Sequence, residues 1–216
     1  MHHTISAEGF GIRLRPVRME DAPFIVWLRN LNHVKGRVGD SATTVESQRA
    51  WLAAYFDRPN DLYFLIETIK GTPLGAYGIY DIADGSGESG RWAVRPLVPA
   101  AIPAVILGFD LGFGALGLKE LRIRTVSTNQ PVLSMNRKIG LRQIQVVPGE
   151  TVIGGESVDI VHFRINASEW EQSRRRLSPL ATLAEKQMAE CESQLATNTG
   201  DDAMPPESKP PHPSLT

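Results

Sequence analysis

The sequence predicts a single α+β domain, of the mixed α/β kind, built on one sheet. Segments with the alternation of strands and segments with helical spacing follow one another in the order β-α-α-β-β-β-α-β-α-β-β. The longest uncharged stretch, residues 96–109, is interrupted by Pro99 and Pro103. Because a membrane span needs about 20 apolar residues, this stretch predicts a buried helix of a globular domain.

The first third of that order begins with a strand and two helices. Residues 10–17 alternate apolar and polar side chains, which is typical of a half-buried strand. Residues 18–30 place Asp21 and Pro23 ahead of an apolar face, and this pattern predicts a helix. A second helix is expected to open at Thr44, because a capping side chain stands there before aromatic and aliphatic residues at helical spacing.

The middle of the chain predicts three more strands. Residues 61–69 and 74–82 are rich in β-forming side chains and are separated by the turn sequence of residues 70–73, so they predict a hairpin. Residues 86–90 are rich in serine and glycine and are expected to form a turn. That turn would lead into a short strand at residues 91–95.

The last elements alternate helix and strand. Residues 99–116 predict a deeply buried helix, and residues 118–127 predict a strand by their strong alternation. Residues 131–139 predict a short helix that ends at Gly140. Two further strands, paired with each other, are expected at residues 141–147 and 158–165.

The chain divides into four parts. A leading extension, residues 1–9, precedes the domain at residues 10–166. A helical extension, residues 167–196, is expected to form two helices, 167–177 and 180–195, and to be largely solvated, with Trp170 as its one large anchor. Residues 197–216 contain five prolines and no apolar period, which predicts a disordered tail.

Composition excludes several classes of protein. The formal net charge is −1, from 23 basic and 24 acidic residues, so no basic field favours nucleic acid. One cysteine, Cys191, excludes an internal disulfide and a cysteine-rich zinc site. Neither a secretory signal nor a membrane span is visible, and no metal-ligand pattern is present. These features predict a soluble cytoplasmic protein, and they leave both a monomer and a homodimer open.

One segment carries a family resemblance. Residues 129–141 read NQPVLSMNRKIGL after an alternating strand, and they are preceded by Phe113 and by Leu-Gly-Leu at residues 116–118. This pattern resembles the GCN5-related N-acetyltransferase (GNAT) superfamily, as does the opening of residues 12–22. Residues 27–30 and 48–52 further resemble the branch that acetylates amino sugars linked to nucleotides. The resemblance covers about residues 10–166.

The resemblance implies a cleft for acetyl-CoA between two splayed parallel strands, residues 91–95 and 118–127. In such a cleft the first strand pairs with pantetheine, and the pyrophosphate lies on the N-terminus of the long helix. The loop after Arg95 departs from the family's glycine-rich pattern, because three prolines remove N–H donors. Arg95 is expected to contact phosphate, with a solvated residue at the strand end as the alternative. The implied cofactor-binding residues are Ala93, Val94, Arg95, Ala100, Ala101, Asn129 and Asn136.

The implied chemistry is acyl transfer to an amine. Asn136 stands where many relatives have a tyrosine that protonates the leaving thiolate, and an amide can only hydrogen-bond. Catalysis is then expected to depend on positioning and on polarisation of the thioester by the backbone of residues 93–95. Glu88 is the first candidate for the general base, with a plain solvated turn as its alternative. His162 is the second candidate, and a structural histidine is the alternative there.

The acceptor is expected to be a small molecule with a primary amine. Tyr77 and Tyr80 are candidates for holding a sugar ring, although strand aromatics also serve packing. Arg29 and Asn30 are candidates for the acceptor's phosphate or hydroxyl groups, and the alternative is a basic residue that stabilises a helix terminus. The leading hypothesis is an N-acetyltransferase acting on a nucleotide-linked amino sugar. A protein N-terminal acetyltransferase and a non-catalytic GNAT-like binding domain remain the alternatives.

Overall fold

A computed structural model describes residues 3–32, 34–36 and 42–195 of the chain. Its centre is one mixed sheet of eight strands in the order β1-β2-β3-β4-β5-β6-β8-β7. Only β5 and β6 run parallel; the other neighbours are antiparallel. The strands are β1 (Ala7–Gly9), β2 (Ile12–Pro16), β3 (Leu62–Thr68), β4 (Pro73–Ala83), β5 (Ser86–Val94), β6 (Glu120–Val126), β7 (Arg142–Ile153) and β8 (Glu156–Asn166).

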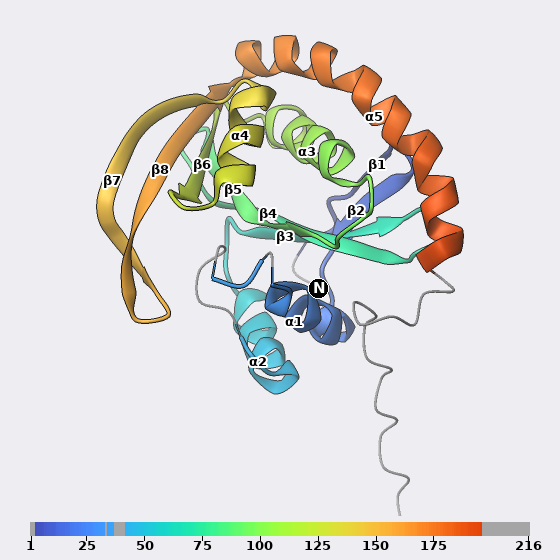
Figure 1. Cartoon of the computed structure of the whole chain (residues 1–216), viewed down its shortest axis with the longest axis horizontal. Coiled ribbons are helices and arrows are strands. Elements are labelled where there is room, and N and C mark those ends of the chain that lie inside the picture. Colours follow the sequence, from blue (N-terminus) through green and yellow to red (C-terminus); the bar gives the residue numbers. More distant parts are fainter. Residues whose placement is uncertain (1–2, 33, 37–41, 196–216) are drawn as a thin grey trace, which may run out of the picture.

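Helices cover both faces of the sheet (Figure 1). One face packs against α1 and α2, and the other against α3, α4 and α5. The helices are α1 (Ala22–Asn30), α2 (Val45–Tyr55), α3 (Ala101–Asp110), α4 (Gln130–Ile139) and α5 (Ala167–Leu195), and α3 continues into a π-helical turn, Leu111–Ala115. The architecture is the single-sheet α+β fold that the element order predicts.

Strand β3 shows why two layers of helices are needed. All seven of its residues are buried. Leu62, Phe64 and Ile66 point to the side of α3, whereas Tyr63 and Leu65 point to the side of α1 and α2. A strand that is buried on both faces carries an unbroken apolar run. Both cores therefore meet at the middle of the sheet.

The parallel pair β5 and β6 is joined only at one end. Ser86, Gly87 and Glu88 lie opposite Glu120, Leu121 and Arg122, and the pairing stops there. Beyond Glu88 the first strand remains paired with β4 as far as Val94. The backbone groups of β5 that face β6 are consequently released from the sheet, and the two strands enclose a V-shaped opening.

The structure corrects the predicted turn at residues 86–90. These residues belong to β5, and the tight turn lies earlier, at Asp84 and Gly85, which both have positive φ. Serine and glycine usually favour turns, but here small side chains suit close packing, because a Cβ on Gly87 would lie 3.1 Å from Leu118. Glu88 is therefore a strand residue and not part of a solvated turn.

The two ends of the domain also differ from expectation. Residues Ala7–Gly9, predicted as an extension, form β1 at the edge of the sheet. The two predicted C-terminal helices are one helix, α5, which contains Pro179. The prediction of a largely solvated extension is wrong, because α5 packs against α3 and buries a stripe of side chains, namely Trp170, Leu177, Ala181, Ala184 and Met188. The predicted tail at residues 197–216 lies outside the described residues.

Polar contacts fasten α5 to the end of α3. The indole of Trp170 donates to Asp110 at 2.9 Å, and Arg174 forms an ion pair with the same carboxylate at 2.8 Å. Within the described ranges, none of the helices combines the length and apolar character that crossing a bilayer would require.

Candidate active site

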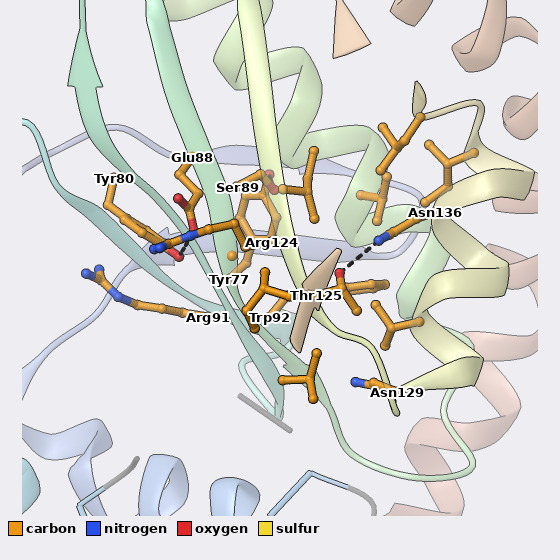
Figure 2. Close-up of a pocket in the computed structure, with 18 of the residues that line it drawn as sticks. Tyr77, Tyr80, Glu88, Ser89, Arg91, Trp92, Arg124, Thr125, Asn129 and Asn136 are labelled. Atoms are coloured by element: carbon orange, nitrogen blue, oxygen red, sulfur yellow. Dashed lines mark hydrogen bonds and ion pairs between the residues drawn. The ribbon is translucent and has the colours of Figure 1, made fainter. Parts of the chain in front are cut away.

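A cavity of about 300 Å³ lies where β5 and β6 separate. Its wall combines residues of β4, β5 and β6 with residues of α3, α4 and the β7–β8 hairpin. Figure 2 shows two polar groups in it, one around Glu88 and one around Asn136. Apolar side chains such as Val105 and Ile123 lie between the elements and form the remaining wall.

The first polar group is centred on Glu88, whose side chain is buried. The Tyr80 hydroxyl donates to Glu88 Oε1 at 2.7 Å, and Arg124 Nε donates to the same oxygen at 2.9 Å. Tyr80 and Glu88 are directly opposite residues of β4 and β5, so the sheet register brings them together. Within the described part of the chain, Glu88 Oε2 accepts no hydrogen bond. One carboxylate oxygen is thus fixed while the other remains available.

Arg124 extends this group to the outer strands. Its Nη1 lies 3.7 Å from Oε1 of Glu150, and the other oxygen of Glu150 is hydrogen-bonded to Nε2 of His162. His162 lies opposite Arg124 in the β6–β8 ladder, so both side chains point to the same face of the sheet. The group therefore runs from β5 to β7 across the opening of the V.

Aromatic rings surround a second arginine of the cavity wall. The guanidinium of Arg91 lies 4.2 Å from the ring centre of Tyr80 and 5.2 Å from that of Trp51. Its two terminal nitrogens bind both oxygens of Asp61. Arg91 has φ of +49°, which turns its side chain out of the regular strand pattern. This part of the cavity wall therefore presents a guanidinium group set among aromatic rings.

The second polar group lies between α4 and β6. The Asn136 side-chain amide donates to Thr125 Oγ1 of β6 at 3.0 Å, and both residues are buried (Figure 2). Asn129 is the N-cap residue of α4 and is also buried. The helix ends where the sequence predicts, at Gly140, which has φ of +100°. The amide of Asn136 is thus held in one orientation within the cavity wall.

The two tyrosines of β4 stay neutral over a wide pH range. Burial is the main cause that raises the pKa of Tyr80, and the negative charge of Glu88 raises it further. Burial also raises the pKa of Tyr77, whose hydroxyl shares a 2.8 Å hydrogen bond with Ser89. A neutral phenol donates hydrogen bonds, so Tyr80 acts as a donor to Glu88 rather than as an acid.

The residues around the V-shaped opening fit an acyl-CoA group. Beyond Glu88, the edge of β5 that faces β6 offers backbone N–H and C=O groups. The first turn of α3 offers N–H groups that have no hydrogen-bond acceptor within the helix. Pro103 has no N–H to give, which leaves Ala101 and Ile102 as donors in that turn. Ala100, the N-cap residue of this helix, is itself buried in the core beside α3.

The structure brings five of the predicted site residues into the cavity wall. These residues are Tyr77, Tyr80, Glu88, Asn129 and Asn136. His162 does not line the cavity, but it contacts Glu150, which does. Arg29 and Asn30 lie at the end of α1, where Arg29 lowers the pKa of Tyr63 against the larger effect of burial, and Asn30 donates to its own helix at Val26.

The predicted phosphate-loop residues lie outside the cavity wall. The Arg95 guanidinium packs over the ring of Trp27 at 5.4 Å and approaches the carbonyl of Pro73. Ala93 is buried on the side of α1, and Val94 packs on the opposite core. Ala100 and Ala101 begin α3. Their contact with acetyl-CoA, and that of Arg95 with phosphate, stay predictions.

Reasoning from the sequence missed most of the cavity wall, including four residues that contribute to its polar contacts. They are Arg91, Arg124, Thr125 and Glu150. Arg124 and Thr125 lie in a predicted strand, but alternation does not tell which face of a strand meets a cavity. Glu150 lies between the two predicted strands of the final pair, in a segment expected to be a loop. In the described part of the chain, no group of three or more His, Cys, Asp or Glu side chains is arranged to hold a metal ion.

Comparison with known proteins identifies the fold family. A family model described as acetyltransferase (GNAT) domain matches residues 12–142. A GCN5-related N-acetyltransferase from Brucella melitensis superposes with a TM-score of 0.71 at 20% identity, over 82% of this chain and 85% of that chain. A comparison with curated protein sequences gives no match.

Two further solved structures are of GNAT enzymes with different substrates. The apo form of FdhC, a nucleotide-linked sugar GNAT, has a TM-score of 0.68 at 22% identity, over 83% of this chain and 99% of that one. A variant of the spermidine N-acetyltransferase SpeG from Vibrio cholerae has a TM-score of 0.66 at 16% identity, over 76% and 98%. With the family model covering more than half of the chain, the protein belongs to the GNAT family of acetyltransferases.

Proposed function

We propose that the protein transfers the acetyl group of acetyl-CoA to the primary amine of a nucleotide-linked amino sugar. The observation that carries this proposal is the composition of the cavity wall, where Glu88 stands beside two arginines and aromatic rings. An ammonium group suits the carboxylate, and the phosphates of a nucleotide suit guanidinium groups. The likeness to a nucleotide-linked sugar GNAT supports the same class of acceptor.

The charge balance of the cavity argues against two other acceptors. Its charged wall residues are two glutamates and two arginines, namely Glu88, Glu150, Arg91 and Arg124. A polyamine such as spermidine, or a positively charged protein N-terminus, would be favoured by an acidic cleft. The wall is balanced, so an acceptor that carries both an ammonium group and phosphates matches it better.

Acetyl-CoA supplies an activated thioester, whose thiolate leaves readily because thiols have pKa values near 8–9. Glu88 is the proposed general base, and its Oε2 takes the proton that the acceptor's ammonium group must lose. The freed amine attacks the thioester carbon, the C–N bond forms, and the C–S bond breaks. CoA leaves as its thiolate, which takes up the second proton that the acylated nitrogen loses. Asn136, whose amide also donates to Thr125, is proposed to hydrogen-bond the sulfur or the amide. The backbone of residues 93–95, where the Arg95 N–H donates to the Leu74 carbonyl, is proposed to polarise the carbonyl.

A panel of amines tests the acceptor class. The purified chain is incubated with acetyl-CoA and each amine, and the free thiol of CoA is followed with a thiol-reactive dye. The panel contains nucleotide-linked amino sugars, the same amino sugars without the nucleotide, spermidine and a short peptide with a free N-terminus. We expect kcat/KM to be highest for a nucleotide-linked amino sugar and to fall when the nucleotide is removed.

The opposite ranking would refute the acceptor class. A preference for spermidine or for the peptide would assign the protein to another branch of amine acetylation. Calorimetric titration with acetyl-CoA is the control for the cofactor, and absence of binding at sub-millimolar concentration would remove the catalytic proposal itself.

A further inference from the structure

Four charged or titratable side chains form a continuous chain from the cavity wall to the outer hairpin. Glu88 of β5 binds Arg124 of β6 at 2.9 Å, and Arg124 lies 3.7 Å from Glu150 of β7. Glu150 in turn binds His162 of β8. Three of the four residues come from strands on the far side of the V-shaped opening, so the chain of contacts crosses that opening.

Glu150 reaches this position because β7 is irregular at that point. Val147 pairs with Ile160 and Thr151 pairs with Val158, so three residues of β7 face one residue of β8. Gly149, inside this bulge, has φ of +61° and donates its N–H to Asp159 at 2.9 Å. A bulge redirects side chains relative to a regular strand. The irregularity therefore aims Glu150 at Arg124 and the cavity.

We propose that Glu150 is a positioning residue, which acts through Arg124 to hold Glu88 in its productive orientation. This inference rests on the proposed function of Glu88 as the base. The contacts of Glu150 argue against a direct catalytic role, since one of its oxygens faces Arg124 and the other binds His162. Both carboxylate oxygens of Glu150 thus have partners, whereas Glu88 keeps one carboxylate oxygen available to take a proton.

The need for such a residue follows from Arg124 itself. Its side chain is 45% exposed, although it contacts a carboxylate that is only 11% exposed. A long, half-exposed side chain loses rotamer freedom when it is held in one geometry, and a single exposed ion pair compensates little of that loss. A second carboxylate on the other side of the guanidinium restricts Arg124 further. Glu150, itself held by His162, supplies that restriction.

The test is a double-variant cycle of Glu88→Gln and Glu150→Gln, measured with the best acceptor from the amine panel. Glu150→Gln is expected to lower kcat about 10- to 100-fold, because small misplacement of a catalytic group is costly. The KM for acetyl-CoA is expected to stay unchanged. Glu88→Gln with Glu150→Gln is expected to be no slower than Glu88→Gln alone, because residues that act as a unit are not additive. Glu156→Gln, an exposed residue of the same hairpin, is the matched control and should match the wild-type chain.

An unchanged kcat in Glu150→Gln would overturn the proposal, and so would multiplicative losses in the double variant. A loss of acetyl-CoA affinity would instead indicate a general structural defect and would also count against it. A second measurement needs no acceptor: the wild-type chain, the two single variants and the double variant are unfolded in guanidinium chloride. Because both glutamates contact Arg124, the midpoint shifts should be non-additive; additive shifts would overturn the coupling even if no amine in the panel is acetylated.

Discussion

At the scale of single residues, the site depends on how one carboxylate is held. Glu88 is buried, and two donors converge on one of its oxygens. Such an arrangement fixes the direction of the other oxygen, which is what a general base requires before it can take a proton from a bound amine. The role proposed for Glu88 therefore depends on its partners more than on its position in the chain.

Glu88→Gln tests this role directly. The amide keeps the size of the side chain and still accepts hydrogen bonds from Tyr80 and Arg124, but it cannot take a proton. We expect kcat to fall by about 10²- to 10⁴-fold, the usual contribution of a general base. Steady-state kinetics with varied acceptor and fixed acetyl-CoA measures the effect. Activity close to that of the wild-type chain would assign proton removal to another group or to water.

The sequence predicts Glu88 as a candidate base, but it does not predict the contacts that hold this side chain. Tyr80 was expected to contact the acceptor, yet its hydroxyl is occupied by Glu88 and its ring faces Arg91. Arg124 is 36 residues away from Glu88, and only the register of β5 and β6 brings the two together. Because α3 lies between β5 and β6 in the chain, no short turn sets that register.

At the scale of elements, α3 links the core to the cavity. The helix packs Gly108 directly over the ring of Tyr77, so closely that a Cβ at this position would lie 2.4 Å from the ring. Tyr77 in turn forms the hydrogen bond to Ser89 in the cavity wall. The close approach of α3 to the sheet is therefore possible only because Gly108 has no side chain.

Gly108→Ala is expected to destabilise the fold. A methyl group there must displace Tyr77 or the helix, and overpacking of this kind costs about 1–3 kcal/mol of the free energy of unfolding. Gly114→Ala is the matched control, because a Cβ at Gly114 meets nothing within 4 Å, and it should cause no loss of stability. Denaturant unfolding of both variants measures the difference. Equal stability of the two variants would show that the helix adjusts freely.

The C-terminal helix illustrates how a packed element can be predicted as solvated. Its large apolar side chains Leu180 and Leu183 are indeed each 53% exposed. The buried stripe uses Ala181 and Ala184 instead, with Met188 at its end. Small side chains let α5 approach the domain closely, and their low hydrophobicity hides the stripe from a search for large apolar residues.

At the scale of the whole molecule, the tyrosines report on the integrity of both cores. The chain has four tyrosines, and burial raises the pKa of each one. Tyr55 and Tyr63 belong to the core beside α1 and α2, whereas Tyr77 belongs to the core beside α3. The two cores lie on opposite faces of one sheet. Unfolding of either core is therefore expected to expose tyrosine side chains to solvent.

The tyrosine side chains should therefore ionise at alkaline pH only as the chain unfolds. Below about pH 10 the phenols are neutral in the folded and unfolded chain alike. Above that value only the unfolded chain ionises readily, so the free energy of unfolding falls as pH rises. We expect tyrosinate absorbance to appear together with the loss of the circular dichroism signal. Tyrosinate formation near pH 10 in a chain that keeps its native spectrum would contradict the burial of these rings.

The sequence by itself determined the order of elements, the GNAT resemblance and the residues Glu88, Asn129 and Asn136 of the cavity wall. These features depend on local signals, namely periodicity, capping residues and a motif within one helix. Only the tertiary structure decided that residues 86–90 form a strand, that α5 is packed, and that Arg124, Glu150 and His162 join Glu88. Each of these depends on strand register, on a bulge in β7 or on packing between distant segments. Those features depend on contacts between residues that are far apart in the sequence, and a local sequence pattern does not predict such contacts.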